Sequence, residues 1–169
     1  NEVPIGGGTF IDRYEYPNQM GELPKTVVDW QSASALCAKS NKRLCESYEW
    51  EEACGSGARY PYGEDFSAFS CSIAQKNLSS SGVFLNCQSP KGAMDMVGNV
   101  WEWTADTFNP YPGFKADAYK EYSGMLFGST QVLRGGAWTT RSRMIHGTYR
   151  NYFEPHRWNV FSGFRVCKL

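Results

Sequence analysis

The stretch KGAMDMVGNVWEW, residues 91–103, decides the fold, because it suits neither a helix nor a half-buried strand. It crowds two glycines, one asparagine, two carboxylates and two tryptophans together, whereas a regular element shows a single hydrophobic period. A tight turn through Gly98 and Asn99 would bring Asp95 and Glu102 to one cation, with main-chain carbonyls completing an oxygen shell for calcium. The same turn would also form if both carboxylates were merely solvated. The spacing alone leaves the two interpretations open.

The composition bounds the rest of the chain. Its 169 residues, of which 41% are hydrophobic and 15% aromatic, suffice for one compact core, so we expect a single domain over residues 1–169. The formal net charge is +0 and the basic residues are scattered, which argues against nucleic acid as a partner. No apolar run approaches the roughly 20 residues that span a bilayer, so we expect no transmembrane segment. The opening NEVPIGGGTF also lacks the pattern of a signal peptide, although one could have been removed upstream.

Local patterns predict few and short regular elements. Asp29 is a good N-cap for one helix, and Gly55 is a typical stop for another. The expected elements, in chain order, are a strand at 9–16, a helix at about 30–39, a short strand at 42–45, a helix at 46–55, and strands at 131–138 and 161–167. Roughly half of the chain should be irregular, which is typical of loops that are functional or pinned by disulfides or metals.

The chain has six cysteines, none of them in a CxxC pair that would indicate zinc or a redox motif. Disulfides are therefore a better interpretation than free thiols, and they favour an oxidising compartment such as the periplasm, the cell surface or the medium. Cys71 and Cys87 bracket a polar loop that has little else to hold it, so we expect them to pair. Sequence spacing does not settle the other pairings.

Six segments carry a resemblance that covers nearly the whole chain. In order they are KRLCESYEWEEACG, YPYGED, DMVGNVWEWTAD, VLRGGAW, YRN and GFRVC, and they resemble the formylglycine-generating enzyme, or sulfatase-modifying factor, family. The resemblance implies an α+β, C-type lectin-like fold with short strands, about two short helices and much irregular loop, stabilised by calcium. Its calcium ligands would be the side chains of Asp95 and Glu102 and the carbonyls of Gly98 and Val100.

Two further expectations come from the same resemblance. The family places a disulfide between the first helix and the C-terminal strand, which would pair Cys37 with Cys167. The C-terminal half is most similar to the non-haem-iron sulfoxide synthases of ergothioneine biosynthesis. There Tyr119 and Tyr122 would correspond to a tyrosine pair beside the iron, and Arg157 to an arginine that holds a substrate carboxylate. The same residues would also be ordinary as interface tyrosines and a surface arginine.

The chain lacks the metal ligands of both related enzymes. Where the copper-binding cysteines should follow RGG, it has Thr139, Thr140 and Ile145. Its two histidines, His146 and His156, fall short of the three that hold iron in the sulfoxide synthases, which a separate helical domain largely supplies. We therefore expect no copper or iron in the isolated chain, and we assign no catalytic residue apart from the tyrosine pair above.

What remains is a C-terminal segment rich in aromatic residues and arginine, the residue types that dominate binding hot spots. The candidate ligand-binding residues are His146, Arg150, Tyr152, His156, Arg157 and Trp158. Trp101, Trp103 and Trp138 we assign to the core. The leading hypothesis is a secreted or periplasmic, calcium-stabilised domain that binds an unknown small-molecule or protein ligand without catalysis, as a surface receptor or a hypervariable binder would. The alternative is the substrate-binding domain of an iron-dependent oxidoreductase that receives its histidines from another domain.

Overall fold

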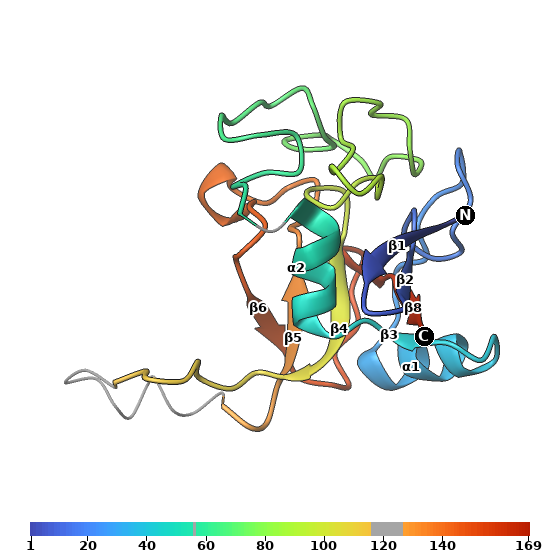
Figure 1. Ribbon diagram of the computed structural model, residues 1–169, viewed down its shortest axis with the longest axis vertical. Coiled ribbons are helices and arrows are strands. Elements are labelled where there is room, and N and C mark those ends of the chain that lie inside the picture. Colours follow the sequence, from blue (N-terminus) through green and yellow to red (C-terminus); the bar gives the residue numbers. More distant parts are fainter. Residues whose placement is uncertain (56, 116–126) are drawn as a thin grey trace.

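The computed structural model describes residues 1–55, 57–115 and 127–169. Its regular elements, in chain order, are β1 (Glu2–Gly6), β2 (Thr9–Asp12), α1 (Trp30–Ala38), β3 (Arg43–Leu44), α2 (Ser47–Gly55), β4 (Trp101–Thr107), β5 (Gln131–Arg134), η1 (Ser142–Met144), β6 (Asn151–Phe153), β7 (Ser162–Phe164) and β8 (Val166–Lys168). Long loops separate them (Figure 1). The expected α+β class, with two short α-helices and short strands, is confirmed.

The strands form two sheets of four. The first has the order β1-β2-β8-β3, with antiparallel neighbours throughout. The second has the order β6-β5-β4-β7, in which only the contact of β4 with β7 is parallel. The single strand predicted at 161–167 is therefore wrong, because it divides into β7 and β8, which belong to different sheets. The break falls at Arg165, whose side chain is fully buried between the sheets.

Local residues cap the start of α1 and end α2, whereas the start of α2 is capped from β4. Asp29 caps α1, since its carboxylate accepts a hydrogen bond from the main-chain N–H of Ser32 at 2.7 Å. At the start of α2, the carboxylate of Asp106 accepts from the N–H of Ser47 at 2.5 Å, so strand β4 provides the cap. Gly55 ends α2 with φ +109°, a conformation that side chains rarely adopt.

The remaining strand predictions need two corrections. The strand expected at 9–16 ends at Asp12 and is the second arm of a hairpin whose first arm, β1, was not predicted. The strand expected at 131–138 ends at Arg134, because Gly135 and Gly136 follow with φ +90° and +87°. A Cβ at Gly135 would lie 2.8 Å from the carbonyl oxygen of Met96, so only glycine allows this close approach of the two segments.

Two hydrophobic clusters fill the interior. One lies under α2 and the N-terminal hairpin and contains Val3, Ile5, Ile11, Trp50, Met96, Val97 and Ile145. The other lies between α1 and the second sheet and contains Val28, Ala33, Leu44, Trp101, Trp103, Leu133, Trp138 and Phe164. All three tryptophans assigned to the core are buried, so that prediction is confirmed.

Two disulfides are present. Cys71 pairs with Cys87 as predicted, and Cys45 pairs with Cys167. The pairing of Cys37 with Cys167 is wrong, because β3 and β8 are neighbours in the sheet and bring the Cα atoms of Cys45 and Cys167 to 4.9 Å. Cys37 and Cys54 are buried free thiols, and burial raises the pKa of each to about 12. They are therefore unreactive in the folded protein.

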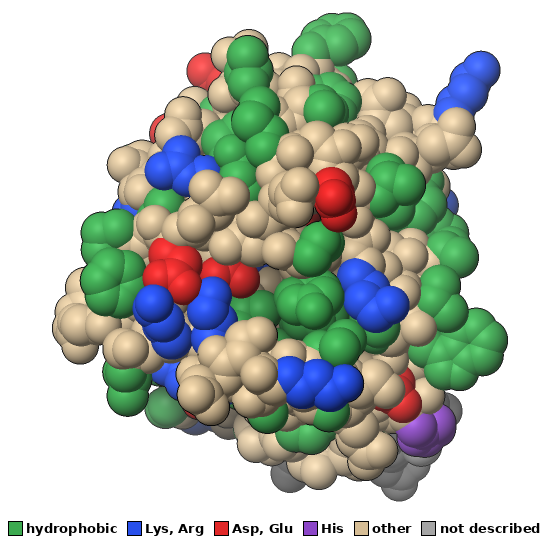
Figure 2. Space-filling model, turned by 90° about the vertical axis from the view of Figure 1, so that its right-hand side faces the viewer, with side chains coloured by type: hydrophobic (Ala, Val, Ile, Leu, Met, Phe, Trp, Pro, Cys, Tyr) green, Lys and Arg blue, Asp and Glu red, His purple; other side chains and the backbone are tan. Residues whose placement is uncertain are grey.

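The surface mixes charges of both signs. Figure 2 shows the face that carries both chain ends, where acidic and basic side chains lie close together with hydrophobic ones between them. Ion pairs such as that of Lys42 with Asp12 at 2.8 Å, and of Lys168 with Glu2 at 2.7 Å, belong to the first sheet. Within residues 1–55, 57–115 and 127–169, no helix is long and apolar enough to cross a membrane.

Candidate functional site

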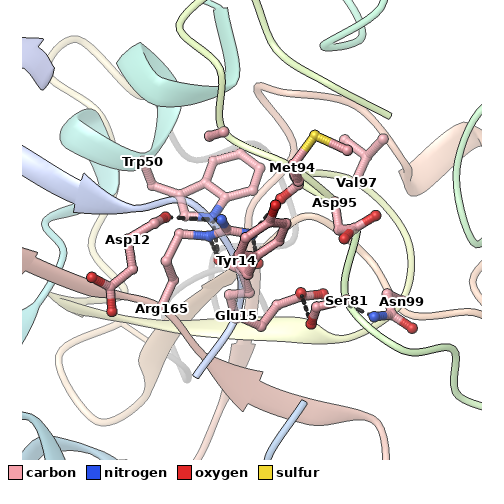
Figure 3. A network of polar contacts seen from close by, with 12 residues as sticks. Asp12, Tyr14, Glu15, Trp50, Ser81, Met94, Asp95, Val97, Asn99 and Arg165 are labelled. Carbon is pink, nitrogen blue, oxygen red and sulfur yellow. Dashed lines mark hydrogen bonds and ion pairs between the residues drawn. The ribbon is translucent and has the colours of Figure 1, made fainter. Parts of the chain in front are cut away.

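A buried polar network surrounds Arg165 and reaches Asn99 of the GNVWEW turn (Figure 3). The carboxylate of Glu102 accepts two hydrogen bonds from the guanidinium of Arg165, at 2.9 and 3.0 Å, and a third from the indole N–H of Trp50 at 2.7 Å. The same guanidinium also donates to the carbonyls of Asp12, Arg13 and Met94. Arg165 thus ties the turn to β2 and to the residues before the motif.

Two more carboxylates are buried beside this ion pair. The side chain of Glu15 accepts hydrogen bonds from Asn99 at 2.9 Å and from Ser81 at 2.7 Å, while Asp95 accepts from the N–H of Gly82 at 2.6 Å. Burial and the nearby Asp95 charge raise the pKa of Glu15 to about 8. Burial likewise raises the pKa of Asp95 to about 6. The network therefore carries more negative charge than the single guanidinium of Arg165 neutralises.

The turn itself has the shape that the sequence predicted. Gly98 has φ +82°, and a Cβ at this position would overlap the carbonyl oxygen of Ser72. Asn99 adopts φ +56°, and its side-chain oxygen accepts a hydrogen bond from the N–H of Ser79 at 3.0 Å. Gly98 is therefore required by both backbone conformation and space, as expected for a tight turn.

The two carboxylates of this turn, Asp95 and Glu102, differ in how well they could bind calcium. Asp95 offers a buried carboxylate oxygen, and burial raises its pKa to about 6, a cost that a bound calcium ion would offset. Glu102 could bind an ion only by sharing its oxygens with Arg165. In the part of the chain that the structure describes, no three His, Cys, Asp or Glu side chains converge on a metal position. Calcium would thus depend on carbonyls such as those of Gly98 and Val100, and it stays a prediction.

The predicted ligand-binding residues near β6 divide between two faces. Arg150 and Tyr152 lie against Phe108: the guanidinium is 4.9 Å from the centre of that ring, and the two aromatic rings are 4.8 Å apart. Phe153 instead packs edge-on against Trp103, and the guanidinium of Arg157 lies 4.2 Å from the Phe153 ring. This division follows from the alternation of side chains along a strand.

The loop after β6 exposes Arg157 and Trp158. The Arg157 side chain is 52% exposed and Trp158 is 64% exposed, and among the described residues the carboxylate closest to Arg157 is that of Glu154 at 4.0 Å. The carbonyl of Pro155 accepts a hydrogen bond from the N–H of Trp30, and the ring of Phe161 packs on Trp138 with centres 4.8 Å apart. The loop is thus fixed at both ends. We call Phe153, Arg157 and Trp158 the Arg157 face.

The two candidate histidines lie in different surroundings. His156 is exposed in the same loop as Arg157. His146 instead lies within hydrogen-bonding distance of Thr148, 3.1 Å from Nδ1 to Oγ1, and burial, with the charge of Arg59, lowers its pKa. Tyr119 and Tyr122 lie outside the described residues.

Sequence reasoning missed the two residues that organise the network, Glu15 and Arg165. The contact of Arg165 with Glu102 joins positions 63 residues apart, which no local pattern predicts. A signal did exist, since Arg165 is the one charged residue in the apolar stretch FSGFRVC. A charge at such a position is rarely buried unless it is paired.

Comparison with known proteins agrees with this architecture. Residues 8–169 match the sulfatase-modifying factor enzyme 1-like domain. The hercynine oxygenase of Mycobacterium tuberculosis is 35% identical over 172 residues, which cover 95% of this chain and 40% of that protein. The chain thus spans well under half the length of this relative, and the expected resemblance to the sulfoxide synthases of ergothioneine biosynthesis is confirmed.

Solved structures show the same fold at lower identity. Treponema denticola variable protein 1 superposes with a TM-score of 0.71 and 20% identity, over 87% of this chain and 71% of its own. The U1 variant of the major tropism determinant gives a TM-score of 0.65 and 15% identity, over 98% of this chain and 51% of its own. The chain therefore belongs to the sulfatase-modifying factor enzyme 1-like family and has the C-type lectin-like fold of the formylglycine-generating-enzyme type.

Proposed function

We propose that this chain is a ligand-binding domain whose Arg157 face recognises a carboxylate-bearing ligand without catalysing its conversion. The observation that carries the proposal is the position of Arg157, which is half exposed and whose guanidinium lies 4.2 Å from the centre of the Phe153 ring. The carboxylate of Glu154 is 4.0 Å away, beyond normal hydrogen-bond distance. A guanidinium held over a ring keeps N–H groups available for a carboxylate.

Preorganisation of the loop supports this function. Residues 155–161 are fixed by the hydrogen bond of Pro155 to Trp30, by that of Asn159 to the N–H of Val27, and by the stacking of Phe161 on Trp138. A loop that is already ordered loses little conformational entropy when a ligand binds. Exposed Trp158 adds an aromatic surface of the kind found at binding hot spots.

The test is a titration screen of small carboxylates, including hercynine and thiol-bearing amino acids, on the wild type and on matched variants. Arg157→Gln should weaken the binding of a carboxylate about 10- to 100-fold, as expected for loss of a charge-assisted hydrogen bond. Arg143→Gln, at an exposed arginine outside this face, should leave affinity unchanged. The proposal would be contradicted if Arg157→Gln bound the carboxylate as tightly as the wild type does, or if the wild type bound none of the carboxylates.

The second candidate is the substrate side of an iron-dependent oxygenase. It is favoured by the 35% identity to a hercynine oxygenase over 95% of this chain. It predicts oxygen consumption in the presence of Fe(II), hercynine and a thiol once a histidine-bearing helical domain is added. The binding proposal predicts no consumption with that domain present, and no stoichiometric copper or iron on the chain alone.

We also propose an extracytoplasmic location and stabilisation by calcium at Asp95. Two disulfides are typical of proteins from oxidising compartments and support the location. Acid quenching of the cells, followed by thiol labelling of the denatured, unreduced protein, tests it. A cytoplasmic chain would label at all six cysteines, and an extracytoplasmic one only at Cys37 and Cys54. The buried Asp95 carboxylate supports the calcium ligand.

A further inference from the structure

A cavity of about 310 Å³ lies between the start of α2 and the end of β4. Its walls include Ser47, Tyr48, Asp106, Tyr111 and Arg150. This volume is at the lower end of the range for small-molecule sites, about 300–1,000 Å³. Arg150 precedes β6 on the face of Tyr152, opposite Phe153, so the cavity is separate from the Arg157 face.

One side of the cavity presents a positioned cation. The guanidinium of Arg150 lies 3.7 Å from the centre of the Tyr111 ring and donates a hydrogen bond to the carbonyl of Asn109 at 2.9 Å. Within the described ranges no carboxylate forms an ion pair with Arg150. A guanidinium has five N–H donors in a fixed plane, so most of them remain available for a carboxylate.

The cavity wall also presents negative charge from Asp106. Burial and the charge of Asp106 raise the pKa of the nearby Glu46. A protonated amine near Asp106 would relieve this repulsion. Glu51, which also lines the cavity, is already paired with the buried Arg134. Among the described residues, the cavity wall thus offers Arg150, which forms no ion pair, and the carboxylate of Asp106.

A buried polar atom without a partner lies in the cavity wall. In the part of the chain that the structure describes, Ser47 Oγ has no hydrogen-bond partner, and Ser47 lines the cavity. Buried polar groups normally have partners, so this hydroxyl indicates a place that can receive a polar group from outside.

We propose that this cavity binds a free α-amino acid with an apolar or aromatic side chain, its carboxylate on Arg150 and its ammonium group on Asp106. The two charged groups match the two ends of a zwitterion. Tyr48 and Tyr111, with side chains 69% and 56% exposed, supply the apolar walls. Nothing in this site depends on the Arg157 face.

Calorimetric titration with L-phenylalanine and L-leucine tests the proposal, with the methyl ester and the N-acetyl derivative of L-phenylalanine as probes of each end. The free amino acids should bind, and both derivatives should bind more weakly. Arg150→Gln should weaken binding about 10- to 100-fold. Asp106→Asn should weaken binding by a similar factor. It should leave α2 capped, because the asparagine side-chain oxygen can still accept the hydrogen bond from the N–H of Ser47. Arg143→Gln, at an exposed arginine outside both sites, should bind as the wild type does.

Each other outcome overturns the inference. Equal binding of the ester would remove Arg150 as the carboxylate partner, and equal binding of the N-acetyl derivative would remove Asp106 as the amine partner. Loss of binding in Arg157→Gln but not in Arg150→Gln would place the ligand on the Arg157 face instead. No binding of either amino acid at millimolar concentration, by variants and wild type of equal circular dichroism, would show that the cavity is not such a site.

Discussion

Replacing Glu15 by glutamine should change how the stability of the protein depends on pH. Glu15 is fully buried, and its two carboxylate oxygens accept hydrogen bonds from Asn99 and Ser81. Glutamine resembles the protonated acid: its carbonyl can accept from Asn99, and its amide can donate to the hydroxyl of Ser81. The variant therefore keeps the packing and removes the titration.

The sign of the effect follows from the pKa. In the folded protein burial and the Asp95 charge raise the pKa of Glu15 from 4.5 to about 8. Between these two values the folded state holds a proton that the unfolded state releases. The contribution of Glu15 to stability is thus fully present below the unfolded pKa and is lost as pH rises through the folded pKa. At about 1.4 kcal/mol for each pKa unit, the change amounts to several kcal/mol.

Urea unfolding at a series of pH values measures this difference. Total stabilities of domains are about 5–15 kcal/mol, so the loss in the wild type is large enough to detect. We expect the wild type to lose stability from about pH 5 to about pH 8 and Glu15→Gln to lose much less over the same range. If the two curves run parallel, Glu15 is charged in the folded protein at neutral pH, and the reasoning is refuted.

Three further predictions concern the disulfides, the turn and calcium. Intact mass of the unreduced protein should lie four hydrogens below that of the reduced chain, two for each bridge, and a loss of six would contradict the free Cys37 and Cys54. In chemical unfolding, Gly98→Ala should lower the free energy of unfolding by more than about 1 kcal/mol more than Gly92→Ala does. Both glycines have positive φ, but only a Cβ at Gly98 would overlap main-chain atoms. Equal losses of stability in the two variants would exclude that overlap. The melting temperature should be several degrees higher with calcium than with a chelator, and Asp95→Ala should abolish this difference. Equal melting temperatures of the wild type in the two conditions would show that Asp95 binds no calcium.

Short-range chemistry made the helices and one disulfide predictable. Asp29 caps α1, Gly55 ends α2, and Cys71 and Cys87 close a short loop, so each depends on residues near in sequence. The GNVWEW turn could likewise be predicted, because its backbone conformation requires a glycine at position 98. These features hold largely irrespective of where distant segments lie.

The parts that could not be predicted depend on distant segments. The pairing of β3 with β8 selects Cys45 over Cys37, and no spacing rule distinguishes them. The partner of Glu102 is Arg165, 63 residues away, and it competes with the expected ion. The six candidate ligand residues looked like one segment. Alternation along β6 instead places Arg150 and Tyr152 on one face, against Phe108, and Arg157 lies on the other, against Phe153.

The place of β8 in the first sheet affects how the protein is made. The strand β2 is synthesised well before its partner β8, and Cys45 is synthesised 122 residues before its partner Cys167. Before Cys167 is made, the free cysteines Cys37 and Cys54 lie close to Cys45 in the sequence. A bridge from Cys45 to either of them would close a short loop, which costs less entropy than a long one. A nascent chain oxidised early would therefore tend to trap a wrong bridge, which thiol–disulfide exchange must then reshuffle. Recombinant yield should thus depend on delaying oxidation until the whole chain is released.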